Sequence, residues 1–436
     1  MSRKNVGSTA ESVPLLKRFG HRTLRVPGSK SLTSRAILLG ALGAGRTVLE
    51  NPLKCDDTIF LADALSKIGV GVKWSPIKLV LHGVDGKPPH GASINLGAGG
   101  TPTRLMIAVG ALAKEPVTVD GNRKMRTRPV GELLTFLREL GVNFDSETLP
   151  VTIDGTNLHG GSVNVPITKS SQFITALMLI APFVEDGITL NCQEPITSST
   201  YVDLTINVLR TFGVDVSDKK GETNREISVP RARVTHRELD IEPDASSAVY
   251  FASVAAIHEG MTITLEGLSL SSAQPDMEAI RLLGTIGAEV VESENGIKIT
   301  GTGKIHGFGD LDASGFPDAS LCLASVAAVA DSPSRIYGLE TLPLKESDRI
   351  EVMSRSLAMA GCGISSGDTD IRISPLKKIK TPIAIDPVDD HRIAMALAVL
   401  GSKRGGISIV NPSCVTKSYP NFWLDLRKVF EGRDNP

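Results

Sequence analysis

The sequence is poor in several residue types whose scarcity excludes whole classes of protein. Aromatic residues make up only 4% of the chain, which leaves few side chains that could stack on nucleic-acid bases. The 47 lysine and arginine residues nearly balance the 48 aspartate and glutamate residues, giving a formal net charge of -1. Proteins that bind nucleic acid in general are usually basic overall. We therefore expect no nucleic-acid partner.

Cysteine is also scarce, with five residues scattered along the chain and no CxxC pair. An odd, scattered set argues against a disulfide framework and against a structural zinc site, and it fits a reducing compartment. No apolar run reaches about 18 residues, and the first twenty residues lack the apolar core of a secretory signal. We expect no membrane partner and a cytoplasmic location.

The chain has 436 residues, which is too long for one ordinary hydrophobic core and predicts two domains of about 200 residues each. An internal repeat divides it further. Amphipathic segments that end in glycine and continue into a strand recur at intervals of 72, 72, 74, 74 and 71 residues. Glycine suits the left-handed residue that ends many helices. These glycines are Gly69, Gly141, Gly213, Gly287, Gly361 and Gly432.

A second series of segments begins with small or polar residues and then turns almost wholly apolar. Successive starts are 70, 70, 75, 73 and 72 residues apart, near Ser31, Thr101, Ser171, Ser246, Ala319 and His391. A helix that is apolar on every side is buried on every side. Two series with matching steps predict six α/β units, three in each domain, each with one buried and one outer helix.

The starts of the expected buried helices are candidate ligand sites. A helix N-terminus offers unpaired N–H groups and about half a unit of positive charge, so it favours anions. The first one, PGSKSLTSR, carries Lys30, Ser31 and Arg35. A capped surface helix is the alternative interpretation, but the apolar AILLGALG that follows argues against it.

Two further segments extend this pattern. LGAGGTPTRL places Gly100 at a helix start, with Thr101 as a candidate cap and Arg104 one turn on. GNRKMRTRP is a basic run that would normally be a solvated surface. We favour Arg128 as its ligand-binding residue because Pro129 stiffens that position.

Hydroxyl and amide groups gather at the start of the next expected buried helix, in TKSSQF. Simple capping would explain one serine but not the whole set of Ser170, Ser171 and Gln172.

The second half of the chain carries the candidate acidic residues and most of the remaining candidate cations. Asp318 opens one buried segment, where capping is an equally good explanation. The other candidate residues in this half are Lys345, Glu346 and Arg349 in LKESDRI, His391 and Arg392 in DDHRIAM, and Lys417 in SCVTKSYP.

None of these sets has the arrangement of a Ser-His-Asp triad, a Walker loop or a metal-binding HExxH motif. Many cations with a few carboxylates suit anionic substrates and proton transfer. We expect no metal and no cofactor.

Taken in order, the motifs PGSKSxxxR, GGTxxR, RP, SSQ, PDA, KExDR, DHRxA and KSYP resemble those of the 5-enolpyruvylshikimate-3-phosphate synthase (EPSP synthase) family, from about residue 20 to the C-terminus. The resemblance implies transfer of the enolpyruvyl group of phosphoenolpyruvate to the 5-hydroxyl of shikimate 3-phosphate, with release of phosphate. It also implies a two-domain inside-out α/β fold of six βαβαββ repeats, with buried helices inside and sheets outside. This agrees with the six-unit spacing.

The resemblance also implies the roles of individual residues. Shikimate 3-phosphate would bind Lys30, Ser31, Arg35, Ser170, Ser171, Gln172, Ser198, Tyr201, Asp318 and Lys345. Phosphoenolpyruvate would bind Lys30, Gly100, Arg128, Gln172, Arg349, Arg392 and Lys417. The residues with catalytic roles would be Asp318, Glu346, Lys30 and His391.

We expect residues 1–28 and 242–436 to form one discontinuous domain, which carries the phosphoenolpyruvate and proton-transfer groups. Residues 29–241 would form the inserted domain with the shikimate 3-phosphate groups, and the active site would lie in the cleft between the two. We expect a monomer. The sequence departs from the family pattern at Ala98 and Leu105, where asparagine and proline are usual, and the resemblance implies that both positions lie around the phosphoenolpyruvate pocket.

Three alternatives stay open. The UDP-N-acetylglucosamine enolpyruvyl transferases share the repeat fold, but they typically have Lys-Asn in place of Lys30-Ser31 and a cysteine that residues 112–130 lack here. A phosphate-ligand binder without activity would gain nothing from Asp318 and Glu346. An RNA-end-processing enzyme on a related fold would need a basic surface.

Overall fold

The computed structural model describes residues 10–16, 19–377 and 381–432. The chain divides into two compact units, each with its own hydrophobic core. Unit 1 comprises Met1–Val26 and Pro243–Pro436, and unit 2 comprises Pro27–Glu242. Unit 2 is therefore inserted into the sequence of unit 1.

Unit 2 contains three sheets of one design. In each, the first strand runs parallel to the second, and a hairpin then adds two antiparallel strands, as in the order β6-β7-β9-β8. The strands are β3 (Arg46–Glu50), β4 (Gly71–Trp74), β5 (Lys78–His82), β6 (Ala92–Asn95), β7 (Val117–Asp120), β8 (Asn143–Phe144), β9 (Val151–Asp154), β10 (Gly161–Val165), β11 (Ile188–Gln193), β12 (Ser217–Lys220), β13 (Asn224–Val229) and β14 (Glu238–Asp240). Strand β14 returns from the end of the unit to pair in parallel with β3, which closes the first sheet.

Unit 1 repeats the design with two four-stranded sheets and one sheet of three described strands. Its strands are β1 (Ala10–Ser12), β2 (Gly20–Leu24), β15 (Met261–Glu266), β16 (Glu289–Ser293), β17 (Gly296–Thr300), β18 (Gly309–Asp312), β19 (Ser334–Tyr337), β20 (Gly363–Ser366), β21 (Asp370–Ser374), β22 (Ile383–Ile385) and β23 (Ile407–Val410). The N-terminal strands complete two of these sheets, because β2 pairs in parallel with β15 and β1 pairs antiparallel to β23. The last repeat thus ends in a helix and borrows β1 in place of a hairpin.

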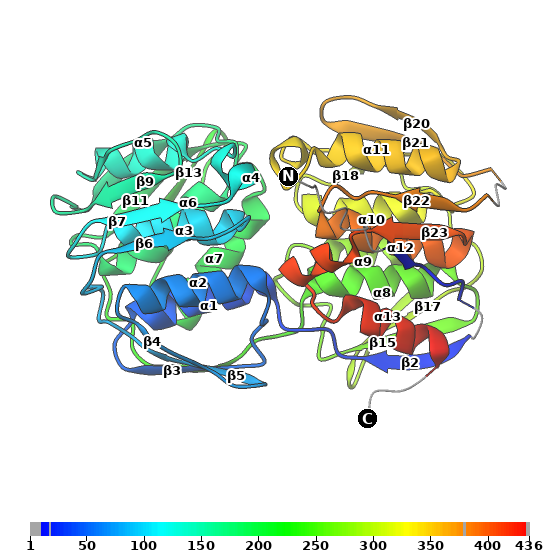
Figure 1. The fold of residues 1–436 in the computed structure, drawn as a ribbon, viewed down its shortest axis with the longest axis horizontal. Coiled ribbons are helices and arrows are strands. Elements are labelled where there is room, and N and C mark those ends of the chain that lie inside the picture. The colour runs from blue at the N-terminus through cyan, green and yellow to red at the C-terminus, as the bar shows by residue number, and fades with distance from the viewer. Residues whose placement is uncertain (1–9, 17–18, 378–380, 433–436) are drawn as a thin grey trace, which may run out of the picture. The chain divides into compact units, whose positions relative to one another are not determined.

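The helices fall into two classes, as the two sequence series predict. The buried ones are α1 (Lys30–Leu42), α3 (Gly100–Gly110) and α6 (Gln172–Ile180) in unit 2, and α8 (Ala245–Ile257), α10 (Pro317–Ala327) and α12 (His391–Arg404) in unit 1. Helices α8, α10 and α12 pack against one another (Figure 1). The prediction of buried helices inside each unit is confirmed.

The outer helices are amphipathic. They are α2 (Asp56–Lys67), α5 (Gly131–Glu139), α7 (Ser199–Thr211), α9 (Met277–Thr285), α11 (Arg349–Ala360) and α13 (Phe422–Glu431). The six predicted terminal glycines all have positive φ, between 75° and 121°, in or directly after the last turn of these helices. Short pieces complete the described fold: α4 (Arg123–Arg126), η1 (Ala181–Phe183), η2 (Leu342–Leu344) and η3 (Pro412–Lys417).

Among the described residues, no helix is long and apolar enough to cross a membrane.

Candidate functional site

The predicted residues of unit 2 lie at the starts of the buried helices α1, α3 and α6, at the start of α7, and between α4 and α5. We call this set the unit 2 cluster: Lys30, Ser31, Arg35, Gly100, Arg128, Ser170, Ser171, Gln172, Ser198 and Tyr201. Arg35 is its most buried cation, at 4% exposure. Its guanidinium donates to Thr205 Oγ1 at 2.9 Å, to the carbonyl oxygens of Ser31 and Tyr201 at 3.0 and 3.1 Å, and to Thr175 Oγ1 at 3.4 Å. Helices α1, α6 and α7 therefore meet around one cation.

Every hydrogen-bond acceptor of Arg35 recorded among the described residues is neutral. Burial lowers the pKa of Arg35 to about 10, so the side chain is still charged at neutral pH. A buried cation held only by neutral acceptors is costly unless an anion compensates it. This arrangement is suited to a bound phosphate.

Gly100 and Arg128 form the second part of the unit 2 cluster. A Cβ atom at Gly100 would lie 2.7 Å from Arg128 Cζ, which is closer than carbon atoms approach without a shift. A side chain at position 100 would therefore displace the Arg128 guanidinium. Arg126 of the same basic run instead pairs with Asp120 at 2.6 Å. The choice of Arg128 as the ligand-binding residue of this run stays a prediction.

Arg104 contacts both Gln172 and the backbone next to Arg128, and it was not among the predicted site residues. It is buried, stacks 5.2 Å from the ring centroid of Phe173, and donates to Gln172 Oε1 at 2.5 Å and to the carbonyl oxygen of Pro129 at 3.0 Å. It thus fixes Gln172 and the backbone beside Arg128. The signal in the sequence that could have indicated this role is a lone arginine inside an apolar helix.

Lys30 begins α1 and forms an ion pair with Asp57 of α2, with 3.2 Å between Nζ and Oδ2. The helix cap is Ser29, whose hydroxyl accepts from Leu32 N, so Ser31 is not used as the cap. Ser198 precedes α7 with a left-handed φ of 51° and makes no side-chain cap. The expectation that Thr101 caps its helix is wrong, because the cap position is Gly99 and Thr101 lies inside α3.

The predicted residues of unit 1 also come together, at the starts of α10, α11 and α12. We call this set the unit 1 cluster: Asp318, Lys345, Glu346, Arg349, His391, Arg392 and Lys417. Arg349, only 1% exposed, is its centre. Its guanidinium contacts Asp318 Oδ1, Glu346 Oε2 and Asp390 Oδ2, each at 2.8 Å.

Charge compensation in the unit 1 cluster differs from that around Arg35. Burial acts to lower the pKa of Arg349, but Asp390, Glu346 and Asp318 outweigh it and hold that pKa above its ordinary value.

Asp318 does not cap α10. It lies at a side-chain exposure of 19% between Arg349, Arg392 Nη2 at 3.0 Å and Lys345 Nζ at 3.5 Å. The capping interpretation of Asp318 is therefore wrong.

Glu346 joins the cluster to the C-terminal segment, because Lys417 in η3 pairs with its second oxygen. His391 is buried at the first turn of α12, with Nδ1 3.9 Å from Asp390 Oδ1, which exceeds hydrogen-bond distance. The turn before it is strained, since Val388 and Asp389 both have positive φ. Such strain persists where surrounding contacts fix the backbone.

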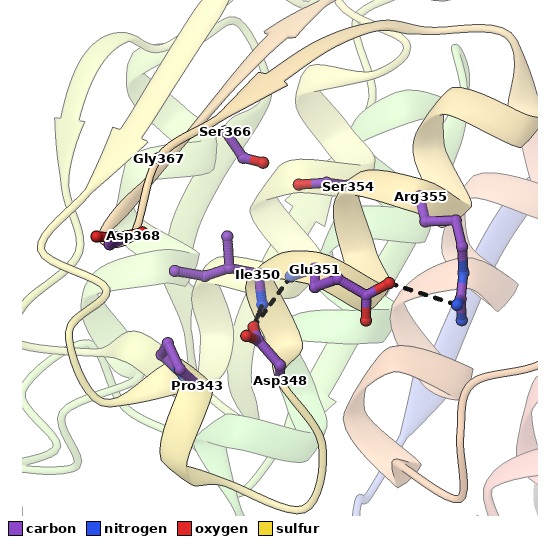
Figure 2. A pocket seen from close by; sticks show the side chains of 9 residues that line it. All are labelled: Pro343, Asp348, Ile350, Glu351, Ser354, Arg355, Ser366, Gly367 and Asp368. Carbon is purple, nitrogen blue, oxygen red and sulfur yellow. Dashed lines mark hydrogen bonds and ion pairs between the residues drawn. The ribbon is translucent and has the colours of Figure 1, made fainter.

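A separate pocket of about 610 Å³ lies in unit 1 (Figure 2). It is formed by α11, the β20–β21 hairpin and the segment at Pro343, and no residue of the unit 1 cluster lines it. Its Asp348 accepts from the backbone N–H groups of Ile350 and Glu351, both at 3.1 Å, and so caps α11. This cap fixes the start of the helix that presents Arg349 to the cluster.

Comparisons with known proteins agree with this geometry. Residues 21–426 match the family described as EPSP synthase (3-phosphoshikimate 1-carboxyvinyltransferase). The chain belongs to the EPSP synthase family. Curated relatives named 3-phosphoshikimate 1-carboxyvinyltransferase include that of Methanoculleus marisnigri, 36% identical over 92% of this chain and 94% of the relative. Another is that of Syntrophobacter fumaroxidans, 36% identical over 93% of this chain and 96% of the relative.

Among solved structures, EPSP synthase from Acinetobacter baumannii is similar to this chain with a TM-score of 0.78 and 25% identity, covering 96% of this chain and 98% of that one. The predictions of the EPSP synthase family, the inside-out α/β fold class and the transferase class are confirmed. The roles of the individual residues stay predictions.

Proposed function

We propose that this EPSP synthase family member transfers the enolpyruvyl group of phosphoenolpyruvate to the 5-hydroxyl of shikimate 3-phosphate and releases phosphate. Its relatives carry this activity in their name. The observation that supports it most strongly is Arg35, a buried cation whose recorded acceptors among the described residues are all neutral. A phosphate monoester would supply the missing negative charge.

Shikimate 3-phosphate binds the unit 2 cluster in this proposal. Its phosphate lies near Arg35, and the hydroxyl groups of Ser170, Ser171 and Ser198 suit phosphate oxygens and ring hydroxyls. Gln172, held by Arg104, and Tyr201 complete the binding surface. Lys345 and Asp318 of unit 1 contact the same ligand in this proposal.

Phosphoenolpyruvate binds Lys30, Gly100, Arg128 and Gln172 from unit 2, and Arg349, Arg392 and Lys417 from unit 1. Three arginines and two lysines match the charges of a carboxylate and a phosphate on one small molecule. The guanidinium fork is suited to bidentate contact with both groups. Preorganised cations also stabilise negative charge that develops on the departing phosphate.

The carboxylates of unit 1 supply proton transfer. In the addition step, Glu346 gives a proton to the CH2 carbon of phosphoenolpyruvate, which becomes a methyl group. The substrate 5-hydroxyl oxygen bonds to the adjacent carbon, and its proton passes to Asp318. In the elimination step, the methyl group returns a proton to Glu346 and the C=CH2 bond re-forms. The C–O bond to phosphate breaks, and the departing phosphate takes the proton that Asp318 received. Lys30 and His391 assist as charged or polar groups beside the reacting atoms.

Phosphate release in the presence of shikimate 3-phosphate and phosphoenolpyruvate tests the proposal. UDP-N-acetylglucosamine in place of shikimate 3-phosphate tests the related transferase activity, and we expect no release with it. Binding of both substrates without release would support the non-catalytic alternative. The monomeric state and the cytoplasmic location stay part of the proposal.

A further inference from the structure

Asp276 is a buried carboxylate outside the predicted set of site residues. It occupies the N-cap position of the outer helix α9 and is 2% exposed. An aspartate at this position normally accepts from the backbone N–H groups of its own helix, as Asp244 does at α8. Asp276 makes no such bond. Its carboxylate is therefore not used to cap the helix that it precedes.

The carboxylate of Asp276 is instead held by the buried helix α8. Ser246 donates from Oγ to Asp276 Oδ2, while Oδ1 has no hydrogen-bond partner among the described residues. A buried carboxylate oxygen without a donor is costly, so such a group calls for a functional explanation. The nearby Gln274 bonds to Ala245 N at 3.0 Å and to the carbonyl oxygen of Pro243 at 2.8 Å, which fixes this loop against the start of α8.

Helix α8 packs against α10 and α12, whose first turns carry Asp318 and Arg392 of the unit 1 cluster. Tyr250 lies four residues after Ser246, and Arg392 opposes the effect of burial on the pKa of its hydroxyl. Burial raises the pKa of Asp276 to about 6, Arg392 opposes that rise, and Asp318 and Asp244 add to it. Asp276 is thus within electrostatic reach of the pair that Arg392 forms with Asp318 at 3.0 Å.

We propose that Asp276 is a positioning residue for Arg392, anchored by Ser246 and offering its open oxygen to the guanidinium when Asp318 turns to the substrate. This inference rests on the proposed function. Asp318 cannot keep its full contact with Arg392 while it accepts the proton of the 5-hydroxyl. A second carboxylate keeps Arg392 aimed at the anionic group of phosphoenolpyruvate during that step.

The direction in which removal of the Asp276 charge changes phosphoenolpyruvate binding separates a positioning role from a simple charge effect. If Asp276 were only a background negative charge, its removal would tighten binding of the anionic phosphoenolpyruvate. A positioning residue has the opposite effect, because a displaced guanidinium binds less well. A small misplacement of a binding group lowers catalytic efficiency by about 10- to 100-fold.

The test compares Asp276→Asn with wild type and with Glu278→Gln, which removes an exposed charge from the same helix. We expect Asp276→Asn to raise KM for phosphoenolpyruvate about tenfold or more. KM for shikimate 3-phosphate should stay within about twofold, and Glu278→Gln should match wild type in both. An unchanged or lower KM for phosphoenolpyruvate would overturn the proposal, as would a fall in kcat alone.

Ser246→Ala decides the matter if Asp276→Asn does not fold. It keeps the carboxylate and removes its anchor, so KM for phosphoenolpyruvate should rise in the same direction, and a wild-type value would overturn the proposal. If the wild-type protein releases no phosphate, the proposed function fails. Calorimetric binding of phosphoenolpyruvate to wild type and Asp276→Asn then tests Asp276 separately, with weaker binding expected and equal or tighter binding contradicting it.

Discussion

Arg349 and Asp390 form an ion pair that is almost fully removed from solvent, with contacts of 2.8 Å from Nε to Oδ2 and 3.2 Å from Nη2 to Oδ1. The two side chains are 1% and 0% exposed. Asp390 also caps α12 through Arg392 N at 3.0 Å. One aspartate therefore positions two of the arginines that we assign to phosphoenolpyruvate.

Replacing Asp390 with alanine should destabilise unit 1 strongly. Removing one partner of a buried pair leaves the other charge poorly compensated and costs about 3 kcal/mol or more. Urea unfolding followed by circular dichroism measures this loss, with Asp368→Ala, an exposed carboxylate of the same unit, as the control. A loss below about 0.5 kcal/mol for Asp390→Ala, the range of ordinary surface changes, would show that Asp318 and Glu346 suffice to hold Arg349.

Replacing Glu346 with glutamine should lower kcat by about 100-fold or more, because an amide cannot deliver the proton to the CH2 carbon. The side chain keeps its size, so the contacts to Arg349 and Lys417 are perturbed as little as possible. Steady-state phosphate release gives the rate, and Glu351→Gln on the exposed side of α11 is the control. Turnover close to wild type would remove Glu346 from the proton-transfer step.

Replacing Gly100 with alanine should weaken phosphoenolpyruvate binding more than shikimate 3-phosphate binding. The added methyl group would meet the Arg128 guanidinium, which lies 2.7 Å away at Cζ, and push it from its place. We expect KM for phosphoenolpyruvate to rise on the order of tenfold. Gly131→Ala is the control, because a methyl group there has only one neighbour, 3.9 Å away. Equal KM values in wild type and Gly100→Ala would contradict the close packing.

The buried Asp276 predicts a particular dependence of stability on pH. Its pKa is about 6 in the folded protein against an ordinary value of 3.8, so the folded state binds this proton more tightly than the unfolded chain. Stability due to this group therefore falls as pH rises from about 4 to 6. The difference corresponds to roughly 3 kcal/mol at neutral pH.

Asp276→Asn removes that penalty, so it should gain stability relative to wild type as pH rises through this window. Chemical unfolding of both proteins at pH 4.5 and pH 7.5 gives the comparison, and other titrating groups cancel in the difference. If the stability difference between the two proteins is the same at both pH values, Asp276 does not cause the predicted loss of stability between about pH 4 and pH 6.

The repeat architecture could be predicted from the sequence because each unit carries its own local signal. A glycine such as Gly213 ends an amphipathic helix through its own backbone preference, and an apolar run such as that after Ser246 needs no distant partner to indicate burial. The candidate residues could be named for the same reason, since each lies at the start of such a run.

The contacts among those residues could not be predicted, because they depend on chain segments far apart in sequence. Asp318 and Arg392 meet only when α10 and α12 pack together, and nothing near either residue indicates the pair. Asp276 was missed since an aspartate before an amphipathic helix has the pattern of an ordinary cap. Arg104 lies one turn after Gly100 in the same motif, but its contact to Gln172 requires α3 and α6 side by side.

The most direct test of the account is phosphate release by the purified protein with shikimate 3-phosphate and phosphoenolpyruvate together, compared with each alone and with UDP-N-acetylglucosamine as the acceptor. We predict release that requires shikimate 3-phosphate, is abolished or nearly so by Arg35→Ala, and yields one enolpyruvyl product per phosphate. Release with UDP-N-acetylglucosamine but not with shikimate 3-phosphate, or release that Arg35→Ala leaves unchanged, would contradict it.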